Sequence, residues 1–325
     1  MVTYTRRVQL TGGSTFIVSL PSRWVKETGL SKGSELVLEE NNGVLTISNS
    51  QAKPREDTRI LNVSGKPNLE YFQRVLTSIY IAGFDTLTIK SSSYIDSSTI
   101  EAISRFTRLV MGVEIFDESA RSIVLQNVLD SSSFPVSNAV RRMSLNVQTM
   151  IEDTISGMEN SDGDLLESVI GRDDDVDRYQ LYVYREVQAG KNEQENGTFY
   201  LIFSRILERI ADHAVNICKI WKNAGGTRND GVSQLVGLLR ESGKMYIEAV
   251  DAFYSKKFEV LNEIIGKKPK VVNGKSEILR AVTGERSAYT IVPASEEVVR
   301  IGLYATDIAE LAMDMIVAGN EEFTI

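Results

Sequence analysis

The chain has few of the residue types on which most metalloenzymes and secreted proteins depend. Its 325 residues include one histidine, His213, and one cysteine, Cys218. A single cysteine excludes an intramolecular disulfide and favours a reducing compartment. A single histidine excludes, within one subunit, both ferritin-type di-iron sites and the zinc hydrolase sites that use two or three imidazoles.

Several sequence motifs are also absent. No signal peptide and no apolar run of about 20 residues occurs, so we expect a cytoplasmic protein without membrane insertion. No nucleophile elbow, Walker A or dinucleotide-binding motif is present, and residues 11–15 lack the lysine and the following helix that a phosphate loop needs. We therefore expect a protein that is not an enzyme. The length and the 42% apolar content favour two or three domains.

Charge is distributed unevenly along the chain. The net charge is −8, with the acidic excess in residues 136–325. Residues 1–37 are basic by contrast, with Arg6, Arg7, Arg23, Lys26 and Lys32 against Glu27 and Glu35. We therefore expect the basic N-terminal head, rather than the acidic body over residues 136–325, to bind an anionic partner.

Residues 1–52 read as short strands around one helix. The pattern predicts strands over residues 7–9, 15–20, 35–39 and 44–48 and a helix over 22–28, which Pro21 introduces. Asn42 and Gly43 form a strong hairpin signal. A head of this size buries too little surface to be stable alone, so we expect it to dimerise.

The same segment resembles a known DNA-binding family. Residues 6–21, which read Arg-Arg-Val-Gln-Leu-Thr-Gly-Gly-Ser-Thr-Phe-Ile-Val-Ser-Leu-Pro, and the Gly-Leu-Ser-Lys-Gly stretch at 29–33 are similar to AbrB-type swapped-hairpin domains. The resemblance implies that two chains interlace and that basic residues face DNA, here Arg6, Arg7, Arg23 and Lys26. Residues 12–15 depart from the Gly-Arg that many relatives carry. A dimerisation module without DNA binding is the alternative interpretation.

Residues 57–133 alternate predicted strands and helices and form a small α+β domain. Gly83 and Gly112 are the predicted ends of its two helices. Its polar residues are scattered, and no catalytic constellation is found. We expect a spacer or a further dimer contact.

Residues 136–226 and 230–320 are helical and repeat each other. Helices are predicted over 138–158, 163–189, 199–223, 231–254, 257–282 and 295–318. An offset of about 91 to 95 residues aligns Ile170-Gly171-Arg172 with Ile265-Gly266-Lys267. The pattern predicts an all-α body of tandem three-helix bundles.

Two pairs of acidic residues stand out in the first bundle. Asp173 and Asp177 are four residues apart, as are Glu208 and Asp212, so each pair shares one helix face. Such pairs repel unless a cation or a basic partner neutralises them, and antiparallel packing of the two helices would bring all four together. Alternatively, residues 173–177 are a solvated first turn that favours the helix dipole.

The second bundle provides an internal comparison. Both acidic pairs are missing there, because the matching residues are Lys268, Val272, Val299 and Leu303. Independent surface charges would not be expected to appear and disappear together. The comparison favours a metal cluster at Asp173, Asp177, Glu208 and Asp212.

The acidic residues also carry a second resemblance. Residues 208–217, which read Glu-Arg-Ile-Ala-Asp-His-Ala-Val-Asn-Ile, resemble the signature helix of PhoU-type phosphate uptake regulators, and residues 304–310 resemble its second-repeat counterpart. The resemblance implies tandem three-helix bundles whose acids bind divalent or trivalent metal ions, with iron or zinc favoured over magnesium. It implies the four acids above as ligands and His213 as a neighbour rather than a ligand.

An AbrB-like head on a PhoU-like body resembles fused archaeal phosphate regulators. The resemblance implies a homodimeric transcriptional regulator that binds the promoter DNA of phosphate-uptake genes and responds to inorganic phosphate. The alternative is an adaptor that docks on the phosphate ABC transporter ATPase or a sensor kinase without binding DNA. A third interpretation, a hydrolase with a metal-activated water near Glu208, has no accompanying base or nucleophile.

Overall fold

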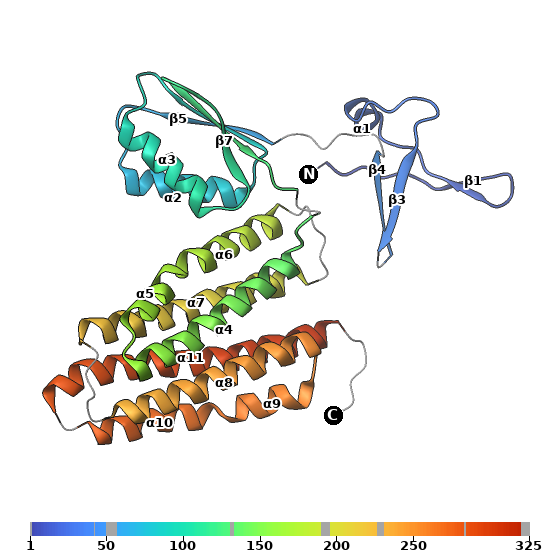
Figure 1. Ribbon diagram of the computed structural model, residues 1–325. Coiled ribbons are helices and arrows are strands. Elements are labelled where there is room, and N and C mark those ends of the chain that lie inside the picture. Colours follow the sequence, from blue (N-terminus) through green and yellow to red (C-terminus); the bar gives the residue numbers. More distant parts are fainter. Residues whose placement is uncertain are drawn as a thin grey trace. The chain divides into compact units, whose positions relative to one another are not determined.

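The computed structural model describes residues 2–41, 43–49, 57–130, 133–189, 196–225, 231–282 and 284–319. The chain divides into two compact units, Met1–Asp57 and Thr58–Ile325 (Figure 1). Within the described residues, no helix combines the length and the apolar character that crossing a bilayer requires.

The first unit consists of two hairpins and one short helix. Its elements are β1 (Gln9–Thr11), β2 (Thr15–Ile17), α1 (Ser22–Glu27), β3 (Leu36–Asn41) and β4 (Val44–Asn49). The pairing of Asn41 with Val44 confirms the predicted two-residue turn; Gly43 has φ +76°, and Asn42 lies outside the described residues. The first strand begins at Gln9, two residues later than predicted.

An α+β layer opens the second unit. Its elements are β5 (Thr58–Val63), α2 (Leu69–Ala82), β6 (Thr86–Ser91), α3 (Ser97–Leu109), β7 (Val113–Ser119) and β8 (Ser122–Asn127). The strands lie in the order β5-β6-β8-β7, with β5 parallel to β6 and the other pairs antiparallel. The side chains of Leu87, Ile103 and Leu125 are fully buried in a core of this layer's own.

The helices of the layer begin and end at recognisable residues. The side chains of Asn68 and Asp96 accept backbone hydrogen bonds at the starts of α2 and α3. Gly83 ends α2 with φ +83°, as predicted. The prediction for Gly112 is wrong, because α3 ends at Leu109 and Gly112 lies in the turn that leads to β7.

The rest of the second unit is helical. Its elements are α4 (Val136–Asn160), α5 (Gly163–Gly171), α6 (Asp173–Gln188), α7 (Gly197–Asn223), α8 (Val232–Ser255), α9 (Phe258–Gly266), α10 (Lys268–Ala281) and α11 (Glu285–Ala318). The helix predicted over 295–318 starts ten residues earlier, so that Pro293 lies inside α11.

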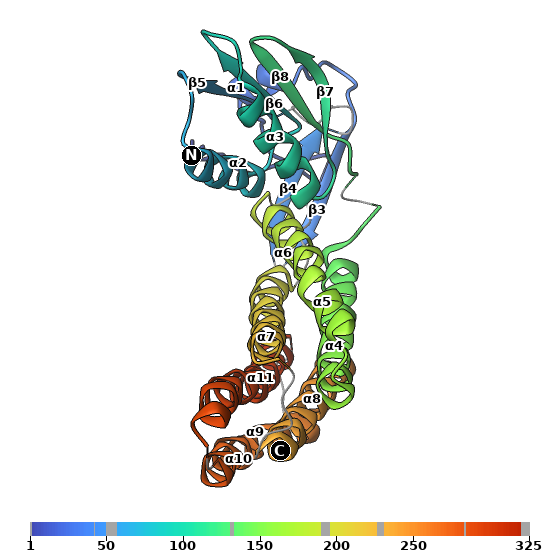
Figure 2. The same ribbon diagram turned by 60° about the vertical axis from the view of Figure 1, so that its left-hand side comes forward.

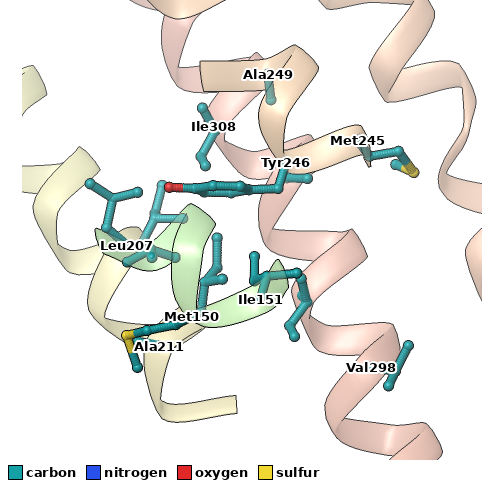
Figure 3. Packing of buried hydrophobic residues seen from close by; sticks show 14 of the residues in the cluster. Met150, Ile151, Leu207, Ala211, Met245, Tyr246, Ala249, Val298 and Ile308 are labelled. Atoms are coloured by element: carbon teal, nitrogen blue, oxygen red, sulfur yellow. The ribbon is translucent and has the colours of Figure 1, made fainter. Parts of the chain in front are cut away.

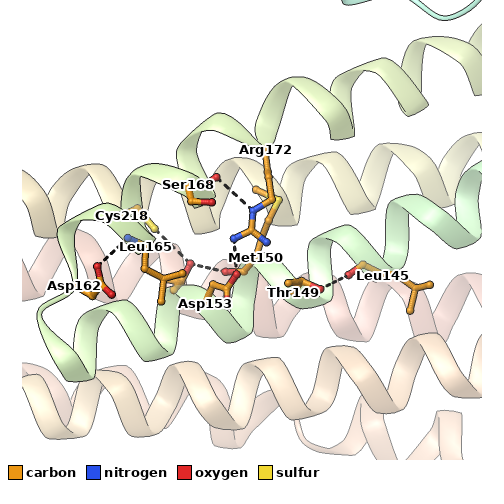
Figure 4. Close-up of polar contacts among 10 residues, drawn as sticks. Leu145, Thr149, Met150, Asp153, Asp162, Leu165, Ser168, Arg172 and Cys218 are labelled. Atoms are coloured by element: carbon orange, nitrogen blue, oxygen red, sulfur yellow. Dashed lines mark hydrogen bonds and ion pairs between the residues drawn. The ribbon is translucent and has the colours of Figure 1, made fainter.

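The middle helix of each repeat is broken, contrary to the single helices predicted. The break follows Gly171 in the first repeat and Gly266 in the second, at aligned positions. Glycine is a poor helix former, and the acidic residues after Arg172 favour the start of a new helix. Arg172 also donates from Nε to the Ser168 carbonyl and from Nη2 to Asp153 at 2.5 Å (Figure 4).

The two repeats share one hydrophobic core. Helices α7 and α11 lie on one side of it and α4 and α8 on the other (Figure 2), and each of the four contacts helices of both repeats. Met150 and Leu207 of the first repeat and Tyr246 and Ile308 of the second belong to the same buried cluster (Figure 3). The Tyr246 hydroxyl donates to the Ser144 carbonyl at 2.7 Å across the seam.

A buried arginine joins the α+β layer to the helices. Arg185 on α6 is 2% exposed. It donates from Nη1 to Asn127 Oδ1 at 2.9 Å and from Nη2 to the Phe84 carbonyl at 3.2 Å, and its guanidinium lies 5.1 Å from the Tyr80 ring centroid. These three partners belong to the α+β layer, so the layer is held on α6.

Candidate functional site

The structure brings the four acidic residues within electrostatic range of one another. Asp173 and Asp177 lie in the first turns of α6, and Glu208 and Asp212 lie in the middle of α7, against which α6 packs. Burial and then the charges of Asp173, Glu208 and Asp212 raise the pKa of Asp177 to about 7. We call these four residues the acid cluster.

Two further carboxyl groups of the acid cluster are perturbed in the same direction. Burial is the main cause of the raised pKa of Asp173, and the charge of Asp212 adds to it while Lys219 opposes it. The pKa of Glu208 is raised by burial and by Asp212, against the opposing charges of nearby arginines. Binding of a proton or of a cation therefore stabilises these carboxyl groups.

Several buried polar atoms at the acid cluster have no hydrogen-bond partner. Glu208 is 9% exposed, and its Oε2 makes no hydrogen bond; the same holds for Oδ1 of Asp173. Buried oxygens without a partner are costly, and in native proteins they are usually completed by an ordered water, an ion or a ligand. Gln180 on α6 is 7% exposed, its Nε2 is also unpartnered, and its amide lies close enough to lower the pKa of Glu208.

Sequence reasoning did not identify Gln180. It lies three residues after Asp177 and seven after Asp173, so it shares their helix face. That spacing is the signal which could have found it.

Two arginines of α7 neutralise part of the acid cluster. Arg209 donates from Nη1 to Asp212 Oδ2 at 3.1 Å. Its Nε is 3.5 Å from Glu208 Oε2, and Nη1 of Arg205 is 3.6 Å from the same oxygen, beyond good hydrogen-bond distance. The basic partner that the sequence left unnamed is therefore this pair of guanidinium groups.

The acid cluster fits a metal ion in donor type and burial. Carboxylate and amide oxygens suit hard and borderline cations, and two of the oxygens lack partners. Among the residues that the structure describes, no three acidic, histidine or cysteine side chains are already arranged around one metal position. Glu208 Oε2 and Asp212 Oδ2 are paired with arginines, so a metal ion that used these two oxygens would have to displace the guanidinium groups.

His213 connects the two repeats. Its Nδ1 is 2.6 Å from Glu297 Oε2, and its ring stacks on Tyr304 with centroids 5.6 Å apart. Asn216 Nδ2 donates to the same Glu297 oxygen at 3.2 Å. This arrangement agrees with the expectation that His213 is a packed, hydrogen-bonding neighbour of the acidic residues.

The predicted DNA-binding residues are all exposed. Arg6, Arg7, Arg23 and Lys26 lie at the surface of the first unit. Arg23 pairs with Glu27 one turn along α1 at 2.7 Å, and the Arg6 guanidinium lies 5.7 Å from the Tyr4 ring centroid. All four side chains are therefore accessible, although Arg23 already has an acidic partner.

Three comparisons with known proteins bear on these sites. Residues 140–221 match the PhoU domain, and residues 9–57 match the domain described as antidote-toxin recognition MazE, bacterial antitoxin. The chain is 28% identical over 120 residues to the phosphate-specific transport system accessory protein PhoU homolog of two strains of Caulobacter vibrioides, NA1000/CB15N and CB 15, covering 35% of this chain and 52% of each relative. The chain thus spans about half the length of the curated relatives it matches.

A solved structure was also found. The crystal structure of PhoU from Pseudomonas aeruginosa is similar with a TM-score of 0.45 and 18% identity, over 57% of this chain and 96% of that one.

Proposed function

We propose that this PhoU-like protein with an N-terminal AbrB-like domain is a cytoplasmic, homodimeric regulator of phosphate uptake, which binds DNA through its head and a metal ion through its helical body. The observation that carries the proposal is the presence of both matches on one chain, at residues 9–57 and 140–221. The curated relatives of the second region are named as accessory proteins of phosphate-specific transport.

Dimerisation is supported by the exposed apolar surface of the head. None of the described side chains of Met1–Asp57 is buried, and Val8, Leu10 and Phe16 are 66%, 58% and 75% exposed. Burying one such side chain contributes about 1.5–3 kcal/mol. A second copy that interlaces its hairpins supplies the missing cover.

DNA binding is supported by the basic side chains of the same unit. Arg6, Arg7 and Lys26 are exposed and free to contact phosphate oxygens. Arg23 must release Glu27 first, and an exposed i,i+4 pair of this kind is worth only about 0.3–0.5 kcal/mol. Dimerisation doubles the number of basic contacts, so the affinity should fall steeply with salt.

Metal binding is supported by the burial and mutual repulsion of the acid cluster. Asp173, Asp177, Glu208 and Asp212 would hold an iron or zinc ion, or less favourably magnesium. A bound ion would neutralise these carboxylates and offer a Lewis-acidic contact to an oxyanion. The function is regulatory and not enzymatic.

Regulation requires that an effector bind two states of the protein differently. Inorganic phosphate can change the DNA affinity only by the difference in its own affinity for the free and DNA-bound forms. We therefore expect the metal-loaded protein to bind promoter DNA differently with and without phosphate.

Fluorescence anisotropy with a promoter fragment of a phosphate-uptake gene tests the proposal. The full-length protein and an Arg7→Ala/Arg23→Ala variant are titrated across a salt series. We expect saturable binding that weakens with salt and with the two substitutions. A matched control is Arg74→Ala/Arg105→Ala, since both arginines pair with an acid four residues before them on exposed helix faces outside the head.

The alternative is an adaptor that uses the head only to dimerise. It predicts no DNA affinity even at low salt, with or without metal. That result would redirect the search to the phosphate transporter ATPase or a sensor kinase as the partner.

A further inference from the structure

We propose that Arg205 and Arg209 exchange partners when a metal ion binds: they leave the acid cluster and form the second half of a metal-dependent site for a tetrahedral oxyanion. This inference rests on the metal binding proposed above. It assigns a ligand-binding role to two arginines, of which Arg209 lies within the motif at residues 208–217 but has no role in the reading of that motif given above.

The starting point is the position of both arginines on α7. Arg205, Glu208, Arg209 and Asp212 are spaced three, four and seven residues apart and share one helix face. In the structure their charges meet, with Arg209 Nη1 at 3.1 Å from Asp212 Oδ2 and both guanidinium groups 3.5–3.6 Å from Glu208 Oε2.

Metal and guanidinium compete for the same oxygens. Glu208 Oε2 and Asp212 Oδ2 face the arginines, and a cation that uses them must displace both guanidinium groups. The arginine contacts to Glu208 are long and do not satisfy its buried oxygen. The exchange is therefore favoured at Glu208, where the existing partners are poor.

A second observation points to a ligand at this place. Gln180 comes from the other helix and is 7% exposed. Its Nε2 has no acceptor within ordinary hydrogen-bond distance, although its amide interacts with the Glu208 carboxyl closely enough to lower the pKa of that group. A buried amide donor without an acceptor is rare unless a ligand or an ordered water completes it. This buried amide thus lies beside the carboxyl group at which the arginine contacts are long.

The released arginines are suited to bind an oxyanion. Their side chains are 46% and 41% exposed, so they can swing away from the carboxylates without leaving the surface of α7. Lying one helical turn apart, they present two planar forks of N–H donors, the geometry that recognises phosphate-type oxygens.

Net charge makes the anion site depend on the metal. The four carboxylates outnumber the two guanidinium groups, so an anion is repelled from the metal-free acid cluster. A divalent ion removes that excess and a trivalent ion reverses it. Oxyanion binding should therefore appear only after metal loading.

The full-length protein tests this with two independent titrations. Mn²⁺ serves as an oxygen-preferring probe, with free Mn²⁺ followed by its electron paramagnetic resonance signal, and phosphate binding is measured by equilibrium dialysis. For Arg209→Ala we expect Mn²⁺ to bind about three- to tenfold more tightly, because a competing cation is gone, and phosphate to bind at least about tenfold more weakly. Arg209→Lys should restore the charge but not the phosphate affinity.

Lys219→Ala is the matched control for charge alone. Lys219 is near enough to oppose the raised pKa of Asp173, but it forms no ion pair with Glu208 or Asp212. Its removal should strengthen Mn²⁺ binding slightly and leave phosphate binding unchanged. If Lys219→Ala weakened phosphate binding as much as Arg209→Ala does, the proposed hydrogen bonding of phosphate by the arginine guanidinium groups would be overturned.

Free phosphate and a phosphorylated side chain offer the same oxyanion. Inorganic phosphate and a phosphoserine peptide are therefore titrated in parallel, and tighter binding of either identifies the source.

If the wild-type protein binds no Mn²⁺, the proposed metal function fails and this inference falls with it. If it binds Mn²⁺ and phosphate but Arg209→Ala changes neither, only the partner exchange is wrong.

Discussion

Removing the charge of Asp177 should stabilise the metal-free protein at neutral and alkaline pH. The folded-state pKa of this carboxyl is raised from 3.8 to about 7, so the folded chain holds the proton more tightly than the unfolded chain does. Ionised Asp177 therefore destabilises the fold. The penalty grows as pH rises from about 4 and is complete above pH 7.

The size of the effect follows from the shift. A change of about three units corresponds to about 4 kcal/mol if it acts in full. Asp177 is only half-buried, and solvent screening reduces this to about 1–2 kcal/mol. In a unit of this size each kcal/mol moves Tm by about 2–4 °C, so Asp177→Asn should raise Tm by about 2–8 °C at pH 8.

Thermal unfolding in the presence of a chelator, followed by circular dichroism from pH 8 to pH 5, measures the prediction. The gain in Tm should shrink as the pH falls from 8 to 5, since the penalty disappears as Asp177 takes up its proton. Asp174→Asn, an exposed neighbour on α6, is the control and should show a much smaller pH-dependent gain, because Asp174 raises the pKa of Asp177 less than do burial and the charges of Asp173, Glu208 and Asp212. If Asp177→Asn left Tm unchanged or lowered it at pH 8, the inferred repulsion between the carboxylates would be refuted.

Three further predictions concern stability. Arg185→Met should lower the free energy of unfolding by about 3–5 kcal/mol, because the contacts that hold the α+β layer on α6 are lost. Amide hydrogens of α2 and α3 should then exchange before those of the other helices. Simultaneous exchange in both regions would contradict this prediction. Gly302→Ala should lower the free energy of unfolding, measured with denaturant, by about 1–3 kcal/mol, since the added Cβ would lie 2.8 Å from a Val271 methyl. Gly237 has open space around it, so Gly237→Ala should raise the free energy of unfolding by up to about 1 kcal/mol. Asp162→Ala should lower the free energy of unfolding by about 1 kcal/mol, because the Asp162 side chain accepts two backbone hydrogen bonds at the start of α5. It should not affect α9, whose start has no side-chain cap.

Helical periodicity predicted the position of the acidic pairs well. Residues four apart on a regular helix must share a face, so Asp173 with Asp177 and Glu208 with Asp212 could be paired from the sequence alone. The same reasoning missed the helix breaks after Gly171 and Gly266. In each repeat a single residue separates the two helices, and the periodic pattern of apolar residues continues across it. The change in helix direction is therefore visible only in the packing of the second helix.

The partners of the acidic residues could not be predicted from spacing. Periodicity shows which residues share a face, but it does not show whether a polar side chain there is buried. Gln180 and Arg185 look like ordinary surface residues of α6 in the sequence, yet both are almost completely buried, one beside Glu208 and the other against the α+β layer. Their roles depend on contacts with residues far away in the chain.

The shared core also bears on why a second repeat without acidic pairs persists. Helices α8 and α11 cover the apolar sides of α4 and α7, including Met150 and Leu207, so the first repeat has no complete interior of its own. A chain cut after α7 would present that surface to water. The second repeat can thus lack the acidic pairs and still be needed, because the folding of the first repeat depends on it.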